Sequence, residues 1–166
     1  MNESEINKIM RKLLQKSFAW LPAILIAAAI FMFSHQPARE STMASDSVSR
    51  IILNLAGQFG IIDLSEADIT GICLAIATPV RKSAHMAEFA ALNLSLVFAL
   101  WSGGKRGRAL LETAFVMAFV YACSDEFHQL FIPGRAGLAA DVLVDSVGMV
   151  IVTFGMHFYW KNRKET

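Results

Sequence analysis

The sequence predicts an all-α membrane protein with four transmembrane helices and an amphipathic or re-entrant helical segment on the outer side. Of its 166 residues, 55% are hydrophobic and 17% are charged, whereas a soluble domain averages about 45–50% apolar and about 25% charged residues. The apolar residues fall in four blocks, and the charged residues fall between them. Each block approaches the roughly 20 residues that a bilayer requires. One domain, covering residues 1–166, is expected at this length.

The first predicted span covers residues 18–34. The tail before it is basic and contains Lys8, Arg11, Lys12 and Lys16. A basic segment before an apolar one is also typical of a signal peptide, but this apolar run is long and no small-x-small cleavage motif follows Phe33. An uncleaved helix is therefore the better interpretation. Pro22 fits it because it falls in the first turns, where few backbone hydrogen bonds are lost.

The other three spans are predicted at residues 79–101, 109–131 and 137–160. Thr78 is a suitable N-cap and Pro79 a suitable first helical residue for the second span. The dipeptide Pro133-Gly134 is expected to end the third span before the fourth begins.

The segment between the first two spans, about residues 42–77, is expected to be helical and to lie on the outer side. Apolar residues recur in it at intervals of three and four, at Val48, Ile51, Ile52, Leu55 and Phe59. This spacing predicts an amphipathic helix that lies on the membrane or caps the bundle. Residues 67–77 are apolar but too few to cross a bilayer, so they are expected to be interfacial or re-entrant.

The basic residues predict the orientation in the membrane. Ten of the fifteen lysines and arginines lie in the N-terminal tail, the 102–108 loop and the C-terminal tail, which share one side if there are four spans. That side is predicted to be cytoplasmic, so both termini are cytoplasmic. Trp20, Trp101 and Trp160 then fall at the inner interface, where tryptophan is favoured.

Composition also bears on partners and on cysteine chemistry. The formal net charge is +1, so no global field attracts nucleic acid, and no nucleic-acid partner is expected. Cys73 and Cys123 form no CxxC motif, and their apolar surroundings favour two free thiols over a disulfide.

Most polar residues of the spans gather at the predicted outer ends. They are Gln36, Arg81, Lys82, His85, Glu88, Asp125, Glu126, His128, Gln129, Arg135, Asp141 and Asp145. A carboxylate inserted in hydrocarbon costs roughly 2.5–3.5 kcal/mol, so these acids require water or basic partners. A polar network also holds helices together, but so many charges at one end favour a functional site.

Helical spacing places several of these residues on common faces. Arg81 and His85 stand four residues apart, as do Asp141 and Asp145. Gly148 and Gly155 continue the face of the two aspartates. Small residues there predict close packing of the fourth span against a neighbour, so the aspartates are expected to point into the bundle.

Three stretches resemble the VanZ-like family of bacterial inner-membrane proteins, over about residues 30–155. They are FSHQP after the first span, RKSAHMAEFAALN at the second, and SDEFHQLFIPGRAGLAADVLVDSVG across the third and fourth. The resemblance implies a multi-pass protein of the bacterial inner membrane. It also implies a link to teicoplanin resistance, with which the founding member of the family is associated. The family's characteristic polar positions correspond to Gln36, Lys82, His85, Asp125, Glu126, Gln129, Arg135 and Asp141.

The first functional hypothesis is an enzyme acting on a membrane lipid or a lipid-linked envelope precursor at the outer leaflet. The candidate catalytic residues are His85, Asp125, Glu126 and Asp141. The candidate substrate-binding residues are Gln36, Arg81, Lys82, Gln129 and Arg135, of which the two arginines suit a phosphate.

One divalent metal ion is a further possibility within this hypothesis, because imidazole and carboxylate groups suit such ions. The candidate ligands are His85, Glu88, Asp125, His128, Asp141 and Asp145. The resemblance argues against an obligatory ligand at 145, since many members of the family carry asparagine there.

Two other hypotheses involve no catalysis. One is a protein that binds or transports a lipid, a drug or a precursor. The other is an envelope assembly scaffold, in which the amphipathic outer helix docks a partner. No nucleophile motif and no HExxH motif occurs, so the reaction type stays open, as does the oligomeric state.

Overall fold

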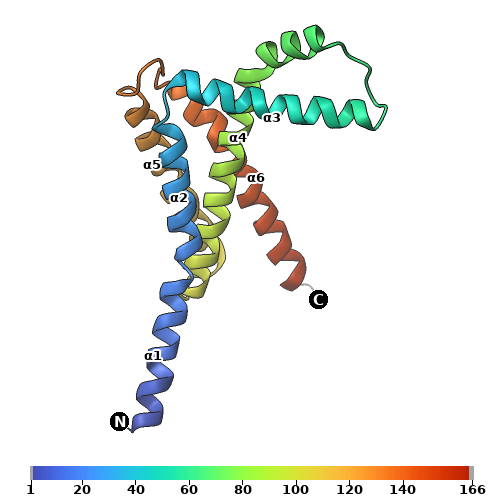
Figure 1. The fold of residues 1–166 in the computed structure, drawn as a ribbon. Coiled ribbons are helices and arrows are strands. Elements are labelled where there is room, and N and C mark those ends of the chain that lie inside the picture. The colour runs from blue at the N-terminus through green and yellow to red at the C-terminus, as the bar shows by residue number, and fades with distance from the viewer. Residues whose placement is uncertain (1, 165–166) are drawn as a thin grey trace.

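The structure, a computed structural model, describes residues 2–164, which form six α-helices and no strand (Figure 1). The helices are α1 (Glu3–Phe18), α2 (Leu21–Ser34), α3 (Ala38–Gln58), α4 (Glu66–Ser102), α5 (Gly107–Gln129) and α6 (Ala139–Lys164). Four stretches are long and apolar enough to cross a membrane: Glu3–Ser34, Glu66–Ser102, Gly107–Gln129 and Ala139–Arg163. These findings confirm the predicted all-α fold with four spans.

The two ends of the bundle of α2, α4, α5 and α6 have different characters. Both chain termini lie at one end, here called the terminal end (Figure 1). At the opposite end α2 and α5 finish and α6 begins, and the polar residues of the spans gather there. We call this the polar end.

The first span is the helix α2, preceded by the helix α1 that the sequence analysis did not anticipate. In α1, Asn2 and Glu5 form a capping box, which satisfies backbone N–H groups that have no partner within the helix. Pro22 lies at the start of α2. This placement confirms the prediction that it falls in the first turns of the span.

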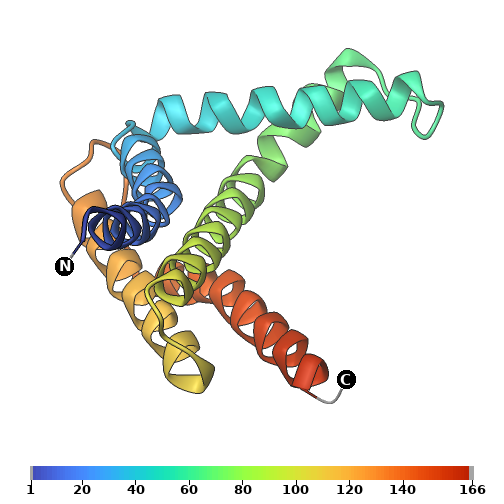
Figure 2. The same cartoon turned by 90° about the horizontal axis from the view of Figure 1, so that it is seen from below.

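Helix α3 runs crosswise to α2 at the polar end, and it projects to one side of the bundle (Figures 1 and 2). An amphipathic helix was predicted here, and the structure confirms it. Its bounds differ from the predicted 42–77, because α3 begins at Ala38 and ends at Gln58.

Helix α4 begins at Glu66, so two predictions about its start were wrong. The N-cap is Ser65, whose side chain accepts a hydrogen bond from the backbone N–H of Asp68, and not Thr78. Residues 67–77 are the first turns of this long helix and not a separate segment. Pro79 lies inside it. A proline there has no backbone N–H to donate, so the helix lacks one hydrogen bond, and the helix packs against α3.

Helices α5 and α6 correspond to the third and fourth predicted spans. Helix α5 covers Gly107–Gln129 in place of 109–131, and α6 covers Ala139–Lys164 in place of 137–160. The connection between them turns at Gly134, whose φ of +74° favours glycine.

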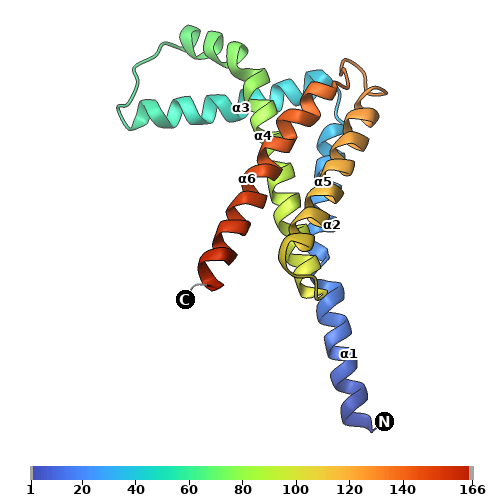
Figure 3. The same ribbon diagram turned by 180° about the vertical axis from the view of Figure 1, so that it is seen from behind.

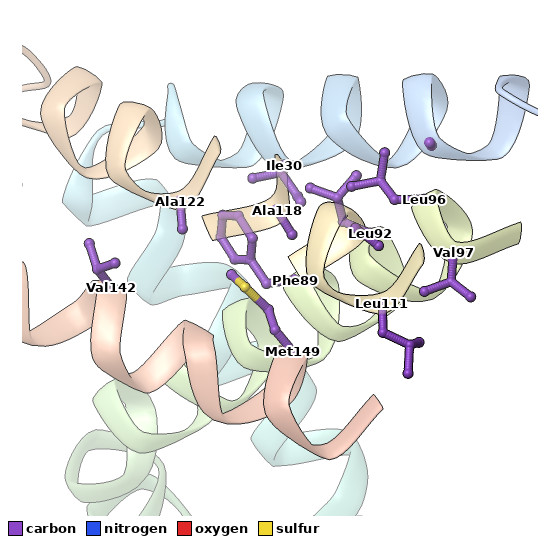
Figure 4. Close-up of a cluster of buried hydrophobic side chains, with 12 residues drawn as sticks. Ile30, Phe89, Leu92, Leu96, Val97, Leu111, Ala118, Ala122, Val142 and Met149 are labelled. Carbon is purple, nitrogen blue, oxygen red and sulfur yellow. The ribbon is translucent and has the colours of Figure 1, made fainter. Parts of the chain in front are cut away.

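The apolar core lies in the middle of the bundle and is built around Phe89 of α4, which is fully buried. Its ring lies against Ala118 and Ala122 of α5 and against Met149 of α6 (Figure 4). The small alanines let α5 approach closely, as is typical of helix packing in membranes. Cys73 and Cys123 are both free thiols, as the sequence favoured.

The close approach of α6 to α4 depends on Gly148. A Cβ atom added at Gly148 would lie 2.2 Å from the carbonyl oxygen of Met86. Beside this contact, the Asn93 amide donates to the Met149 carbonyl at 2.9 Å and to the Thr153 hydroxyl at 3.0 Å. The predicted close packing of this face is therefore confirmed at 148. The close packing of α6 does not extend to Gly155, where an added Cβ atom would have no neighbour within 4 Å.

Candidate functional site

A cavity of about 310 Å³ opens at the polar end. The helices α4, α5 and α6, the loop before α6 and the first residue of α3 form its walls. Its polar lining consists of Thr78, Arg81, Lys82, His85, Glu126, Gln129, Arg135, Asp141 and Asp145. The fold therefore brings together eight of the twelve residues that the sequence analysis singled out, from four separate segments of the chain.

Arg135 fastens the loop to the end of α2. Its guanidinium donates to the carbonyl oxygens of Gln36 and Phe33, both at 2.9 Å, and to the Gln129 side chain at 3.4 Å. The last carbonyls of a helix have no partner within it, so this cation stabilises the end of α2. Burial lowers the pKa of Arg135, and the neighbouring charge of Arg81 lowers it further.

Arg81 has no such attachment. Within residues 2–164, no group forms a hydrogen bond or an ion pair with its guanidinium. It lines the same cavity as Arg135 and is close enough to perturb that residue electrostatically. Two like charges at one cavity repel each other, and an anion between them would offset this repulsion.

Two buried polar atoms at the cavity lack partners within the described chain. They are Nδ1 of His85 and Oδ2 of Asp145. Glu88 is the closest acid to His85, but its carboxylate lies 3.8 Å away, beyond hydrogen-bond distance. Asp145 is only 2% exposed. A buried polar atom without a partner costs free energy, so both atoms suit a bound molecule or water.

Lys82 and Asp141, which both line the cavity, form an ion pair. The ammonium of Lys82 on α4 donates to Oδ1 of Asp141 in the first turn of α6. Both side chains are partly exposed. The pair therefore neutralises both charges and joins the two helices, as expected for acids at this depth.

The Glu126 side chain on α5 binds the loop between α5 and α6. Its carboxylate accepts a hydrogen bond from the backbone N–H of Leu138 at 2.9 Å and one from Gln129 at 3.4 Å. Gly137 is in close contact with α5 here, since a Cβ added to it would lie 2.1 Å from the Glu126 carbonyl oxygen. The predicted catalytic residue Glu126 is thus at the cavity, but its carboxylate already holds the loop.

Asp125 joins α2 to α5 beside the cavity and is not part of its lining. Its Oδ2 accepts hydrogen bonds from the Ser34 hydroxyl at 2.8 Å and from the Gln129 amide at 2.9 Å. The residue is 4% exposed. The structure therefore surrounds this predicted catalytic carboxylate with structural partners. Glu88 also lies outside the cavity lining.

His128 points away from the cavity. Its Nε2 lies 3.2 Å from Nδ1 of His35, and both rings lie against Phe31 on the outside of α2 and α5. No group of three or more histidine, cysteine or acidic residues in the described range could hold a metal ion. The six candidate ligands are therefore not brought together as one set.

Gln36 takes part through its main chain, since its carbonyl oxygen accepts from Arg135. Two further roles were not predicted from the sequence. Ser34 is fully buried and donates to Asp125, and Thr78 lines the cavity. A contact between neighbouring turns of one helix, such as that of Asp125 with Gln129, is visible as a spacing of four residues. A contact between helices leaves no such signal.

The comparison with protein families decides the relationship of this chain. The profile of the VanZ/LLP1 family matches residues 18–160. The chain belongs to this family. It is thus a multi-pass VanZ-like membrane protein, from a family linked to resistance, and the match includes every residue of the cavity lining. No curated protein and no solved structure matches the chain.

Proposed function

We propose that this VanZ-like protein binds the anionic head group of a lipid or lipid-linked envelope molecule in the cavity. The observation that carries the proposal is Arg81, a guanidinium without a protein partner that faces the same cavity as Arg135. The planar guanidinium matches the oxygens of phosphate and carboxylate groups, and a charge-assisted hydrogen bond to such a group is strong. A bound anion would relieve the repulsion between the two arginines.

The depth of the cavity supports a ligand from the membrane. Its lining comes from three of the four helices that are long and apolar enough to cross a bilayer, at the level where α5 ends and α6 begins. A molecule with its head group at this level can keep its apolar part in the lipid. The basic residues of the tails and of the 102–108 loop favour the opposite side as cytoplasmic. We therefore place the head group at the outer leaflet of the bacterial inner membrane, with both termini in the cytoplasm.

His85 and Asp145 would contact the same bound molecule, because each has a buried polar atom without a protein partner. In the enzymatic form of the proposal, His85 exchanges a proton with the bound head group and Asp145 contacts a hydroxyl or amine of it. In the non-catalytic form, the same two residues only hydrogen-bond the ligand. The two forms differ in whether the bound molecule leaves chemically changed.

The first test compares Arg81→Ala with Arg108→Ala, a control at the terminal end whose partner Glu112 is also exposed. The protein is purified from bacterial membranes in mild detergent, and the retained lipids are identified by mass spectrometry. A hydrogen bond to a charged group contributes about 1.5–3 kcal/mol, so Arg81→Ala should weaken retention of an anionic lipid by about tenfold or more. Equal retention by a folded Arg81→Ala protein would refute the proposal.

The second test separates the two forms. Purified protein is incubated with the lipid that it retains, and the lipid mass is followed over time. A mass change that His85→Ala abolishes supports the enzyme, whereas an unchanged mass supports a binding protein. In cells, Arg81→Ala and His85→Ala should lose any increase in teicoplanin resistance that the wild-type protein and Arg108→Ala confer at equal abundance.

A further inference from the structure

Helix α3 presents its apolar side to the outside of the protein. Val48, Ile51, Ile52, Leu55 and Phe59, together called the α3 apolar face, are between 47% and 80% exposed. A helix at the surface of a soluble protein normally buries such a stripe. Ile61, which follows the helix, is 74% exposed and extends this surface.

The side of α3 that packs against the protein is formed by serines. Ser41, Ser45 and Ser49 recur every four residues and are at most 8% exposed. They lie on the side of α3 that the protein covers, and α3 packs against α4. The hydroxyls of Ser45 and Ser49 each donate to the carbonyl four residues earlier in α3. They therefore need no partner on α4, and the small side chains allow a close approach.

A polar edge completes α3. Arg50 donates to Asp46 at 3.0 Å and to Thr70 of α4 at 3.0 Å. The hydrogen bond to Asp46 and the charge of that carboxylate raise the pKa of this partly exposed guanidinium. Asn54 continues the polar edge four residues further on and is exposed. The helix thus has one side for the protein, one for water and one that is apolar and uncovered.

The chain fixes the level of α3 relative to the spans. Arg135 binds the carbonyls of Phe33 and Gln36 just before the helix begins, and the N–H of Ala38 donates to Pro133 at 3.2 Å. Helix α3 therefore starts where the membrane-spanning α2 ends, and it runs crosswise from there (Figures 1 and 3). The first turns of α4 lie further from the spans than α3 does (Figure 3).

We propose that α3 lies in the membrane surface at the polar end, with the α3 apolar face inserted between lipids. The occupant of this face is the lipid leaflet itself, because a helix that leaves a span crosswise at its end lies at the head-group level. The polar edge with Arg50 then faces water and the lipid head groups. This inference depends on the spans and not on the proposed ligand of the cavity.

The test uses single cysteines labelled with an environment-sensitive fluorophore in the full chain. The background is Cys123→Ser, which leaves only the buried Cys73, and this background without a new cysteine is the labelling control. Ile52→Cys and Leu55→Cys report on the apolar face. Asn54→Cys is the matched control on the polar edge. The proteins are reconstituted in vesicles of phosphatidylethanolamine and phosphatidylglycerol.

Labels at 52 and 55 should be quenched by lipids that carry a nitroxide near the head group and be protected from aqueous iodide by at least severalfold relative to 54. Equal iodide quenching at all three positions would overturn the proposal. So would protection from both quenchers, since that pattern means that a second copy or another protein covers the face. Ile51→Cys repeats the measurement if Ile52→Cys does not fold.

Discussion

The two ends of the bundle are held together by different interactions. At the polar end, hydrogen bonds and an ion pair join distant segments: Ser34 of α2 with Asp125 of α5, Lys82 of α4 with Asp141 of α6, and Arg135 with the end of α2. At the terminal end, α6 diverges from α4 (Figure 2), and the aromatic side chains Trp101 and Trp160 line an apolar groove between them. The charged pair Arg108–Glu112 there lies within one helix and is exposed.

The charged residues at the polar end fall into two sets, those that the protein itself binds and those that have groups without a protein partner. Asp125 and Arg135 have their hydrogen bonds made by the protein, so they mainly hold helices and the loop in place. Arg81, His85 and Asp145 have groups that the protein leaves without partners. Substitutions in the first set should therefore affect stability, and substitutions in the second set should affect the ligand.

Among the four comparisons of the two ends, the largest effect on stability is expected from Gly148→Ala. Its Cβ would lie 2.2 Å from the backbone oxygen of Met86, which no rotamer change can move. Overpacking costs about 1–3 kcal/mol and occasionally more, and this contact belongs at the upper end. Thermal unfolding in detergent measures it. Gly155→Ala, in the diverging half of α6, is the control and should leave the Tm unchanged or slightly raised. Equal Tm values for both variants would contradict the close crossing at Gly148.

The next effect is expected from Asp125→Ala. The substitution leaves the buried Ser34 hydroxyl without its acceptor, at about 1–3 kcal/mol, and removes one of the two acceptors of the Gln129 amide. Glu112→Ala at the terminal end should cost only about 0.3–0.5 kcal/mol. Denaturant titration of both variants gives the comparison. If Asp125→Ala is as stable as Glu112→Ala, the network between α2 and α5 does not hold the polar end together.

A smaller effect is expected for the pair Lys82–Asp141. A double-mutant cycle with Lys82→Ala and Asp141→Ala should give a coupling near the top of the range of about 0.2–1 kcal/mol for exposed pairs, because both side chains are only partly exposed. The same cycle for Arg108 and Glu112, with side-chain exposures of 88% and 57%, should give less. High salt should reduce both couplings. A larger coupling for Arg108–Glu112 would reverse the proposed contrast between the ends.

The smallest effect on folding is expected from two cysteine substitutions in exposed loops. Their labelling reports which end of the bundle faces the cytoplasm. In the Cys123→Ser background, Ala136→Cys lies at the polar end and Lys105→Cys at the terminal end. A membrane-impermeant maleimide should label 136 in spheroplasts but label 105 only after permeabilisation. The opposite pattern would place the cavity on the cytoplasmic side and would remove the outer-leaflet part of the proposed function.

The sequence by itself determined the four spans, the amphipathic nature of α3 and the gathering of polar residues at one end. These features follow from apolar run length and from local periodicity, which the backbone geometry of a helix fixes. The same local reasoning gave a wrong prediction at Pro79. A proline is typical of the start of a helix, but this one lies inside α4. The helix continues before the proline, where Arg50 of α3 donates to Thr70, a contact between distant segments that the local preference does not include. Asn2 and Glu5, by contrast, carried the capping-box signal of α1.

Only the tertiary structure decided which polar residues share the cavity. Asp125 and His128 lie in the same turn of α5 as Glu126 and Gln129, yet Asp125 turns to Ser34 and His128 to His35, while the other two line the cavity. Spacing along a helix gives the angle between side chains but not the rotation of that helix against its neighbours. That rotation depends on contacts between distant segments, such as Gly148 against Met86, because close packing allows few arrangements of the helices.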